Sequence, residues 1–265
     1  MPSAGRVRYL EAPPRSERPR GTLVLLHAFP LNARMWEPQL ILADHGWRVL
    51  APHYRGMDGG TQDPPAASID DYAGDVIDLL DSLHIEDAVI GGLSLGGYVT
   101  FALFRHAPRY FRGIVLADTR SQADPPEAAE GRTRLQSAVR EKGPSAAADE
   151  MVPRLLGETT RAERPDVVER VRALILSNPA TAIAGAITAI MTRPDSTPLL
   201  SSIHCPTLIV VGDEDSLTPP AMSRDMQRGI HGSELVVVPK AGHLSSLEQP
   251  SAFNAALAQF LEHRL

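Results

Sequence analysis

The chain has 265 residues, enough for one domain with a large buried core. Its composition, 43% hydrophobic and 22% charged, is ordinary for a soluble globular protein, and a net charge of −6 without a basic stripe argues against a nucleic-acid partner. Cys205 is the only cysteine, which excludes an intrachain disulfide and fits a cytoplasmic location. No apolar stretch approaches the ~20 residues that span a membrane, and no apolar run follows the early arginines, so we expect neither membrane attachment nor a signal peptide.

Short apolar segments rich in β-branched residues recur along the chain, with helical patterns between them. Such segments are typical of strands buried on both faces of a parallel sheet. A single leading strand, 7–10, fits before Thr22, so we expect a truncated N-terminal hairpin. The further expected strands are 22–26, 48–51, 88–90, 113–117, 207–211 and 234–238. This alternation predicts a doubly wound α/β fold with a mostly parallel sheet.

The helical patterns are distributed unevenly along the chain. Ser68 and Asp71 have the spacing of a capping box before one helix, and a closing helix follows Pro250. Residues 121–202 contain helical patterns and no strand-like run. This segment is too long for an ordinary crossover between parallel strands, which needs only about a dozen or more residues. We therefore expect a core formed by 1–120 and 203–265, with 121–202 inserted as a helical lid.

The segment Gly92-Leu93-Ser94-Leu95-Gly96 lies between the expected strand 88–90 and a helical pattern. A Gly-x-Ser-x-Gly sequence at a strand-to-helix turn is typical of a nucleophile elbow, which exposes the serine hydroxyl at the edge of a sheet. The alternative is a glycine- and serine-rich turn without chemistry, which the flanking strand and helix disfavour. Ser94 is therefore the candidate nucleophile.

A serine nucleophile needs a base to take its proton and a third group to orient that base. His243 follows the last expected strand in a glycine-containing loop, at the end of the sheet where functional groups gather. Three carboxylates, Asp213, Glu214 and Asp215, follow the strand 207–211, and Asp118 follows the strand 113–117. Position alone leaves the choice of acid open among these carboxylates.

An oxyanion formed at this serine needs two backbone N–H donors. Leu95, directly after the nucleophile, is one candidate. Phe29, in the loop after the strand 22–26, is the other, because Pro30 has no N–H to donate. His27 stands at the entry of this loop, where we expect it to brace the loop and not to act as the base.

Together these motifs resemble the α/β-hydrolase fold enzymes of the esterase and lactonase type. The resemblance extends over the whole chain and follows the family order of Ser, Asp and His. It implies that Asp215, at the fourth position of the Gly-x-x-Asp-x-x-Thr-Pro motif, is the acid. Two departures are Ala28, where relatives usually have glycine, and His53, which we expect to be structural or pocket-lining. The matching segments are His27-Ala28-Phe29-Pro30 with Trp36, Gly92 to Gly97, Gly212 to Pro219, and Gly242-His243.

The resemblance implies a serine hydrolase without cofactor or metal that cleaves a small carboxylic ester or lactone through an acyl-enzyme. Its catalytic residues would be Ser94, Asp215 and His243, with Phe29 and Leu95 as oxyanion donors. Trp36, Ile187 and Met191 are the expected substrate-binding residues. A thioesterase, a cofactor-free perhydrolase or haloperoxidase, and a ligand-binding receptor on the same fold are the alternatives. The oligomeric state is left open by the sequence.

Overall fold

A computed structural model describes residues 2–4, 7–58 and 66–265. Within these residues one sheet of eight strands has the order β1-β2-β4-β3-β5-β6-β7-β8. The strands are β1 (Ser3–Ala4), β2 (Val7–Ala12), β3 (Gly21–Leu26), β4 (Trp47–Pro52), β5 (Ala88–Leu93), β6 (Phe111–Ala117), β7 (Thr207–Gly212) and β8 (Glu234–Val238). Strands β3 to β8 pair in parallel, which confirms the predicted α/β fold.

The N-terminal hairpin differs from the prediction. β1 pairs with β2 in antiparallel fashion, with Ser3 opposite Arg8, and β2 pairs with β4, also antiparallel. The expectation of a single leading strand was therefore wrong. A strand of two residues is defined by its backbone pairing alone, and it is too short to have an alternating side-chain pattern that sequence analysis could detect.

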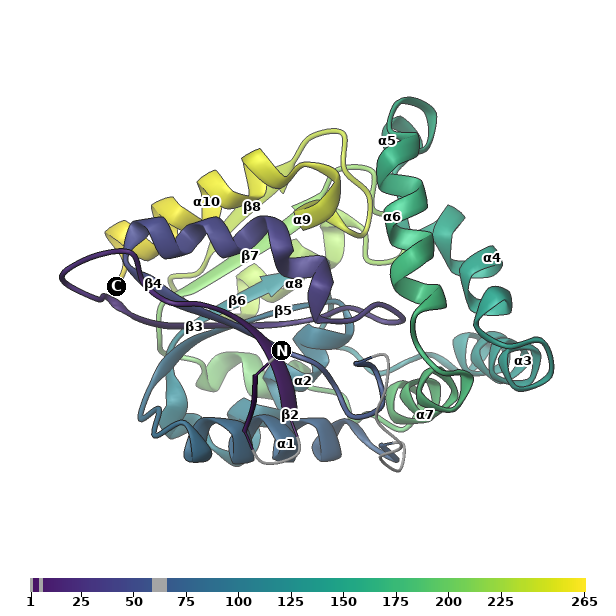
Figure 1. The fold of residues 1–265 in the computed structure, drawn as a ribbon, viewed down its shortest axis with the longest axis horizontal. Coiled ribbons are helices and arrows are strands. Elements are labelled where there is room, and N and C mark those ends of the chain that lie inside the picture. Colours follow the sequence, from purple (N-terminus) through teal and green to yellow (C-terminus); the bar gives the residue numbers. More distant parts are fainter. Residues whose placement is uncertain (1, 5–6, 59–65) are drawn as a thin grey trace.

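Helices cover both faces of the sheet. The core helices are η1 (Ala33–His45), α1 (Ile69–Ser82), α2 (Leu95–His106), η2 (Pro108–Tyr110), α8 (Pro220–Gly229), α9 (Ser245–Glu248) and α10 (Pro250–His263). η1 and α10 pack together over one face, while α1 and α2 pack together over the other (Figure 1). The predicted capping box of α1 is present, because Ser68 and Asp71 each accept a backbone hydrogen bond from the other.

A helical segment joins β6 to β7 and gathers at one end of the sheet (Figure 1). Its helices are α3 (Pro126–Lys142), α4 (Pro144–Leu155), α5 (Glu158–Glu163), α6 (Pro165–Leu176), α7 (Ala180–Met191) and η3 (Thr197–Ser202). Contacts of α3 and α4 with α7, and of α4 with α6, give this segment apolar packing of its own. Its function as a lid stays a prediction.

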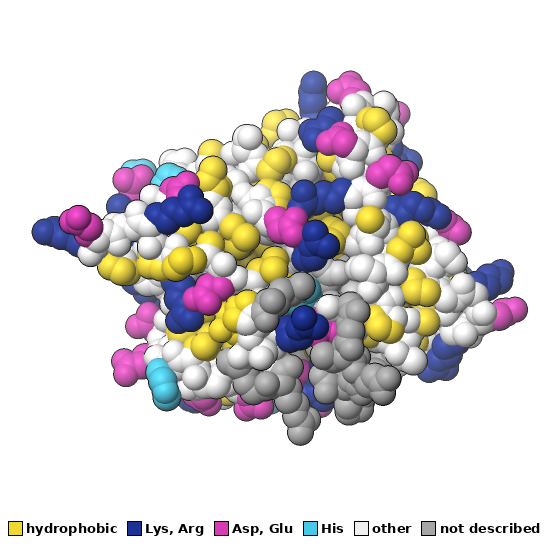
Figure 2. All heavy atoms as spheres, in the orientation of Figure 1, with side chains coloured by type: hydrophobic (Ala, Val, Ile, Leu, Met, Phe, Trp, Pro, Cys, Tyr) yellow, Lys and Arg dark blue, Asp and Glu magenta, His cyan; other side chains and the backbone are white. Residues whose placement is uncertain are grey.

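The face of the protein in Figure 2 is mixed in charge. Figure 2 shows one face, on which Lys and Arg side chains are interspersed with Asp and Glu side chains. In the described part of the chain, no single helix has both the length and the apolarity to cross a membrane. Helices α6 and α7 meet the two criteria only together, across a bend of 95°.

Candidate active site

Ser94 occupies the turn between β5 and α2 in a strained backbone conformation, with φ of 55° and ψ of −111°. A non-glycine residue adopts such a φ only where the surrounding structure holds it. A Cβ on Gly92 would lie 2.1 Å from the backbone carbonyl of Gly96, and one on Gly96 would lie 2.1 Å from the carbonyl oxygen of Leu26. Both glycines are therefore required for the turn to close over β3.

The structure brings Ser94, His243 and Asp215 into one hydrogen-bonded chain. His243 Nε2 lies 2.7 Å from Ser94 Oγ, and His243 Nδ1 lies 2.8 Å from Asp215 Oδ2. Asp215 also accepts the Thr218 hydroxyl at 2.6 Å and the backbone amides of Leu217 and Thr218 at 2.9 Å. An Nδ1–H directed at Asp215 leaves Nε2 free to accept the proton of the Ser94 hydroxyl.

The charge of Asp215 is maintained by its partners. Burial by itself would raise the pKa of this carboxyl, but the hydrogen bonds and charge of His243, together with the Thr218 hydrogen bonds, hold the pKa below its ordinary value. Asp215 is thus a carboxylate at neutral pH, beside the ring nitrogen that it orients.

The other two aspartates do not contact His243. Asp118 is fully buried and accepts the backbone amides of Gly212 at 2.9 Å and Ser245 at 3.2 Å. Burial and the charge of Asp215 raise the pKa of Asp118 well above its usual range. Asp213 receives only a long bond, 3.4 Å, from the amide of Ala241. Glu214 instead accepts the backbone amide of Thr159 at 2.9 Å. The geometry therefore places Asp215, and none of the three alternatives, against the imidazole.

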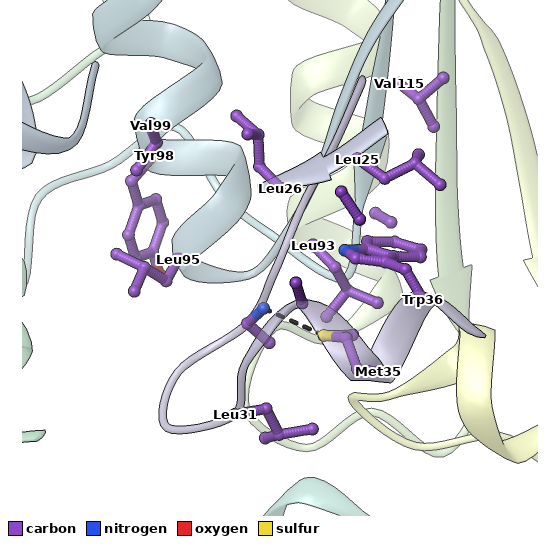
Figure 3. Packing of buried hydrophobic residues seen from close by; sticks show 14 of the residues in the cluster. Leu25, Leu26, Leu31, Met35, Trp36, Leu93, Leu95, Tyr98, Val99 and Val115 are labelled. Atoms are coloured by element: carbon purple, nitrogen blue, oxygen red, sulfur yellow. Dashed lines mark hydrogen bonds between the residues drawn. The ribbon is translucent and has the colours of Figure 1, made fainter. Parts of the chain in front are cut away.

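The two expected oxyanion donors have backbone N–H groups without an acceptor among the described residues. Leu95 is the first residue of α2, where an N–H has no intrahelical partner. Phe29 borders the same cavity as Ser94. The neighbouring Ala28 does not adopt a positive φ, so its Cβ is tolerated where relatives have glycine, and its N–H points to Met35 Sδ at 3.2 Å (Figure 3).

His27 and His53 are structural, as their contacts show. His27 is fully buried; its Nδ1 lies 3.1 Å from the carbonyl oxygen of Ala28, and its Nε2 accepts the Tyr54 amide at 3.1 Å. Burial lowers the pKa of His27 to about 3, so the ring is neutral. His53 is also buried, with Nδ1 2.9 Å from the carbonyl oxygen of Met57. His27 therefore braces the loops after β3 and β4.

Ser94 and His243 line a cavity of about 430 Å³. The helical segment between β6 and β7 supplies much of its wall, including Leu135, Met151 and Ile190. This volume suits a small organic ligand. In the ranges that the structure describes, no three His, Cys, Asp or Glu side chains gather as metal ligands would.

The three expected substrate-binding residues lie outside this cavity. Trp36 is buried in the core near Leu25 and Leu93, with its ring 6.0 Å from that of Phe253 (Figure 3). Ile187 is fully buried and Met191 partly buried on α7, and neither borders the cavity.

The helical rotation of about 100° per residue explains the error at Met191, because its neighbour Ile190 borders the cavity and Met191 does not. Ile187 lies about one turn before Ile190 and is fully buried in the hydrophobic core. The arginines that line the cavity were not predicted from the sequence, because their positions follow no motif.

Comparison with known proteins supports the assignment of the fold to a family. A family model described as "Alpha/beta hydrolase family" matches residues 23–256. The chain belongs to this family. The 3-oxoadipate enol-lactonase 2 of Acinetobacter baylyi is 29% identical over 238 residues, which cover 90% of this chain and 87% of that protein.

Two solved structures are similar over nearly the whole chain. A thermophilic esterase from Thermogutta terrifontis, with malate bound, is 38% identical with a TM-score of 0.91, covering 97% of this chain and 93% of its own. The enol-lactonase from Burkholderia xenovorans LB400 is 26% identical with a TM-score of 0.88, covering 97% and 96%. These three similar proteins are thus named as one esterase and two enol-lactonases.

Proposed function

We propose that this protein is a serine hydrolase that cleaves a small carboxylic ester or lactone without a cofactor. The observation that carries the proposal is the distance of 2.7 Å between His243 Nε2 and Ser94 Oγ at a strained strand-to-helix turn. The similarity to an esterase and to enol-lactonases supports the same class of reaction.

The reaction begins when Ser94 Oγ attacks the carbonyl carbon of the substrate and His243 Nε2 takes the hydroxyl proton. The oxyanion receives the N–H groups of Phe29 and Leu95. His243 then gives its proton to the leaving alcohol, so that an acyl-enzyme remains on Ser94. Water attacks this ester, with His243 as the base, and releases the acid. Asp215 keeps the imidazole oriented and stabilises its charged form.

In this proposal residues 121–202 act as a lid that shapes the substrate pocket. Leu135, Met151 and Ile190 give the cavity apolar walls, and Tyr98 of α2 adds an aromatic one. These walls restrict the chain length and the shape of the substrate, while the loops after β5, β7 and β8 supply the chemistry.

Labelling of the nucleophile tests the proposal. A fluorophosphonate should add once, at Ser94, and the protein should hydrolyse a short-chain 4-nitrophenyl ester. Ser94→Ala should lose both the adduct and the turnover while keeping the thermal midpoint of the wild type within a few degrees. Wild-type protein with neither adduct nor turnover would support the ligand-binding receptor instead.

A perhydrolase is the second candidate, because a putative non-heme chloroperoxidase of Synechocystis is 28% identical over 256 residues. In that reaction hydrogen peroxide replaces water as the attacker of the acyl-enzyme and releases a peracid. Peracid formation from acetate or an acetate ester with peroxide, measured beside simple ester hydrolysis, separates the two activities. A thioester substrate in the same series measures thioesterase activity.

A further inference from the structure

The cavity beside Ser94 has a cationic wall. Four arginines border it, against two glutamates, Glu127 and Glu150. Two of the arginines, Arg134 and Arg154, are more than half exposed, and each lies near a glutamate one helical turn away. The other two, Arg120 and Arg132, are largely buried, with 13% and 23% of their side chains exposed.

The buried arginines converge on one carboxylate. Arg120, Arg132 and Arg193 all form ion pairs with Asp124, whose side chain is 2% exposed. Hydrogen bonds and charges of Arg193 and Arg132 overcome the effect of burial and hold the pKa of Asp124 well below its ordinary range. One carboxylate neutralises one guanidinium group, so this cluster retains two positive charges beside the cavity.

Within this cluster, Arg193 has a structural role. It bonds to Asp124 at 2.8 Å, donates to the carbonyl oxygens of Ile190 and Gln122, and lies 4.0 Å above the ring of Tyr98. These contacts tie the two ends of the helical segment together, and Arg193 alone would neutralise Asp124. The charges of Arg120 and Arg132 are not needed for this purpose.

Arg120 also has an unpaired hydrogen-bond donor. Its Nε–H is buried and has no partner within the described residues, although the side chain borders the cavity that holds Ser94 and His243. Leaving a charged donor buried and unpaired is energetically costly. The Arg120 side chain lies in the cavity wall, and a guanidinium group there can bind the two oxygens of a carboxylate in a planar, bidentate arrangement.

We propose that Arg120 and Arg132 bind a carboxylate of the substrate, so that the enzyme selects an ester or lactone that carries a free carboxylate. This inference rests on the proposed hydrolase function. The substrate would have an acyl carbonyl at Ser94 and an anionic group at Arg120, within a cavity of about 430 Å³. A short dicarboxylic acid monoester meets both requirements.

A matched pair of substrates tests the proposal. Monomethyl adipate and its terminal carboxamide, methyl adipamate, have the same length and differ in charge, so the ratio of their kcat/KM values reports recognition of the carboxylate. We expect a ratio of at least about ten in the wild type, and a fall of about tenfold in Arg120→Met. Arg120→Lys, which keeps the charge without the planar fork, should give a ratio between the two.

The design includes a control for the general charge of the cavity. Arg134→Met removes an exposed arginine from the rim and should change the ratio by less than about threefold. If Arg134→Met lowers the ratio as much as Arg120→Met, the preference comes from the overall field and the assignment to Arg120 is wrong. Asp124 keeps Arg132 and Arg193 when Arg120 is replaced, so its charge stays compensated.

A second measurement uses the wild type alone and needs no turnover. Adipate should slow the fluorophosphonate labelling of Ser94, whereas adipamide at the same concentration should not. Equal effects of the two compounds, or a ratio near one for the two esters, would overturn the carboxylate proposal while labelling of Ser94 still upheld the hydrolase. Absence of labelling and of all turnover would instead contradict the hydrolase itself.

Discussion

The backbone N–H of His243 donates a hydrogen bond of 3.0 Å to the carbonyl oxygen of Leu155, the last residue of α4. The helical segment therefore supports the loop that carries the imidazole. Next to this bond, buried Glu248 accepts the amides of Gly157 at 2.8 Å and Leu244 at 3.0 Å. These bonds join the junction of α4 and α5 to the loop after β8. We infer that this junction positions the loop that carries His243 as well as enclosing the cavity.

The close approach of Gly157 to the histidine loop gives the first prediction. A Cβ on Gly157 would lie 2.8 Å from the backbone nitrogen of Gly242 and 2.4 Å from Glu214 Oε2. Gly157→Ala should therefore push the two segments apart, lower kcat for ester hydrolysis by about tenfold or more, and lower the thermal midpoint.

The matched control for this change is Gly74→Ala in α1, where a Cβ has no neighbour within 4 Å. Alanine in a helix interior is favoured over glycine, so this variant should keep its activity and gain about 0.5–1 kcal/mol of stability. Full activity in Gly157→Ala would show that His243 does not depend on the contact with the helical segment.

The second prediction concerns the acid of the site. Asp215→Asn puts an amide beside His243 Nδ1, so the ring loses its charge partner and the favoured tautomer. We expect kcat to fall by roughly 10²–10⁴ with the fold retained. The measurement is kcat/KM and the thermal midpoint at pH 7.

Asp118→Asn and Asp213→Asn are the comparisons for that prediction. Asp118 accepts hydrogen bonds from Gly212 and Ser245, so an amide there turns one donor toward another, and we expect a loss of stability larger than the loss of rate. Asp213→Asn should have a small effect on both. A collapse of the rate in Asp118→Asn with near-normal rates in Asp215→Asn would contradict the assignment of the acid.

The third prediction follows from the neutral His27. Its pKa in the folded protein is about 3, against an ordinary value of 6.5. Between these two pH values the unfolded chain binds a proton that the folded protein does not, so this residue's contribution to the free energy of unfolding is lost as the pH falls below 6.5. The loss approaches about 1.4 kcal/mol per pH unit.

Replacement of the ring isolates this contribution from those of other buried groups. His27→Gln keeps a side-chain acceptor near the Tyr54 amide but cannot titrate. The stability difference between wild type and variant, measured by urea unfolding, should therefore shrink by about 1–2 kcal/mol between pH 7 and pH 5. A difference that stays constant over this range would mean that His27 takes up its proton in the folded protein as well.

Local patterns predicted most of the fold because the backbone of each element depends on nearby residues. The runs of β-branched residues became parallel strands, and Ser68 with Asp71 formed the expected cap. The elbow was predictable for the same reason, since two glycines at fixed spacing permit a single tight turn around Ser94. β1 was missed because two residues are too few to form a pattern.

The tertiary structure decided which side chains meet. Asp118 and Asp215 both follow strands. Asp215 contacts His243, whereas Asp118 accepts hydrogen bonds from the backbone amides of Gly212 and Ser245. The ends of the strands could be predicted from the local sequence. The direction of each side chain, in contrast, depended on packing between segments far apart in the chain. In the sequence, the resemblance to a family, and not the spacing, predicts Asp215 as the acid.

The wall of the cavity depended on tertiary structure most of all. Arg120, Asp124 and Arg193 are separated by up to 73 positions in the printed numbering, and their convergence follows from the packing of α7 beside α3. The sequence by itself determined the strands, the elbow and the loops that carry candidate catalytic groups, because each depends on short-range backbone preferences. Only the folded chain determined the shape and charge of the cavity, because both arise where side chains from distant segments are buried together.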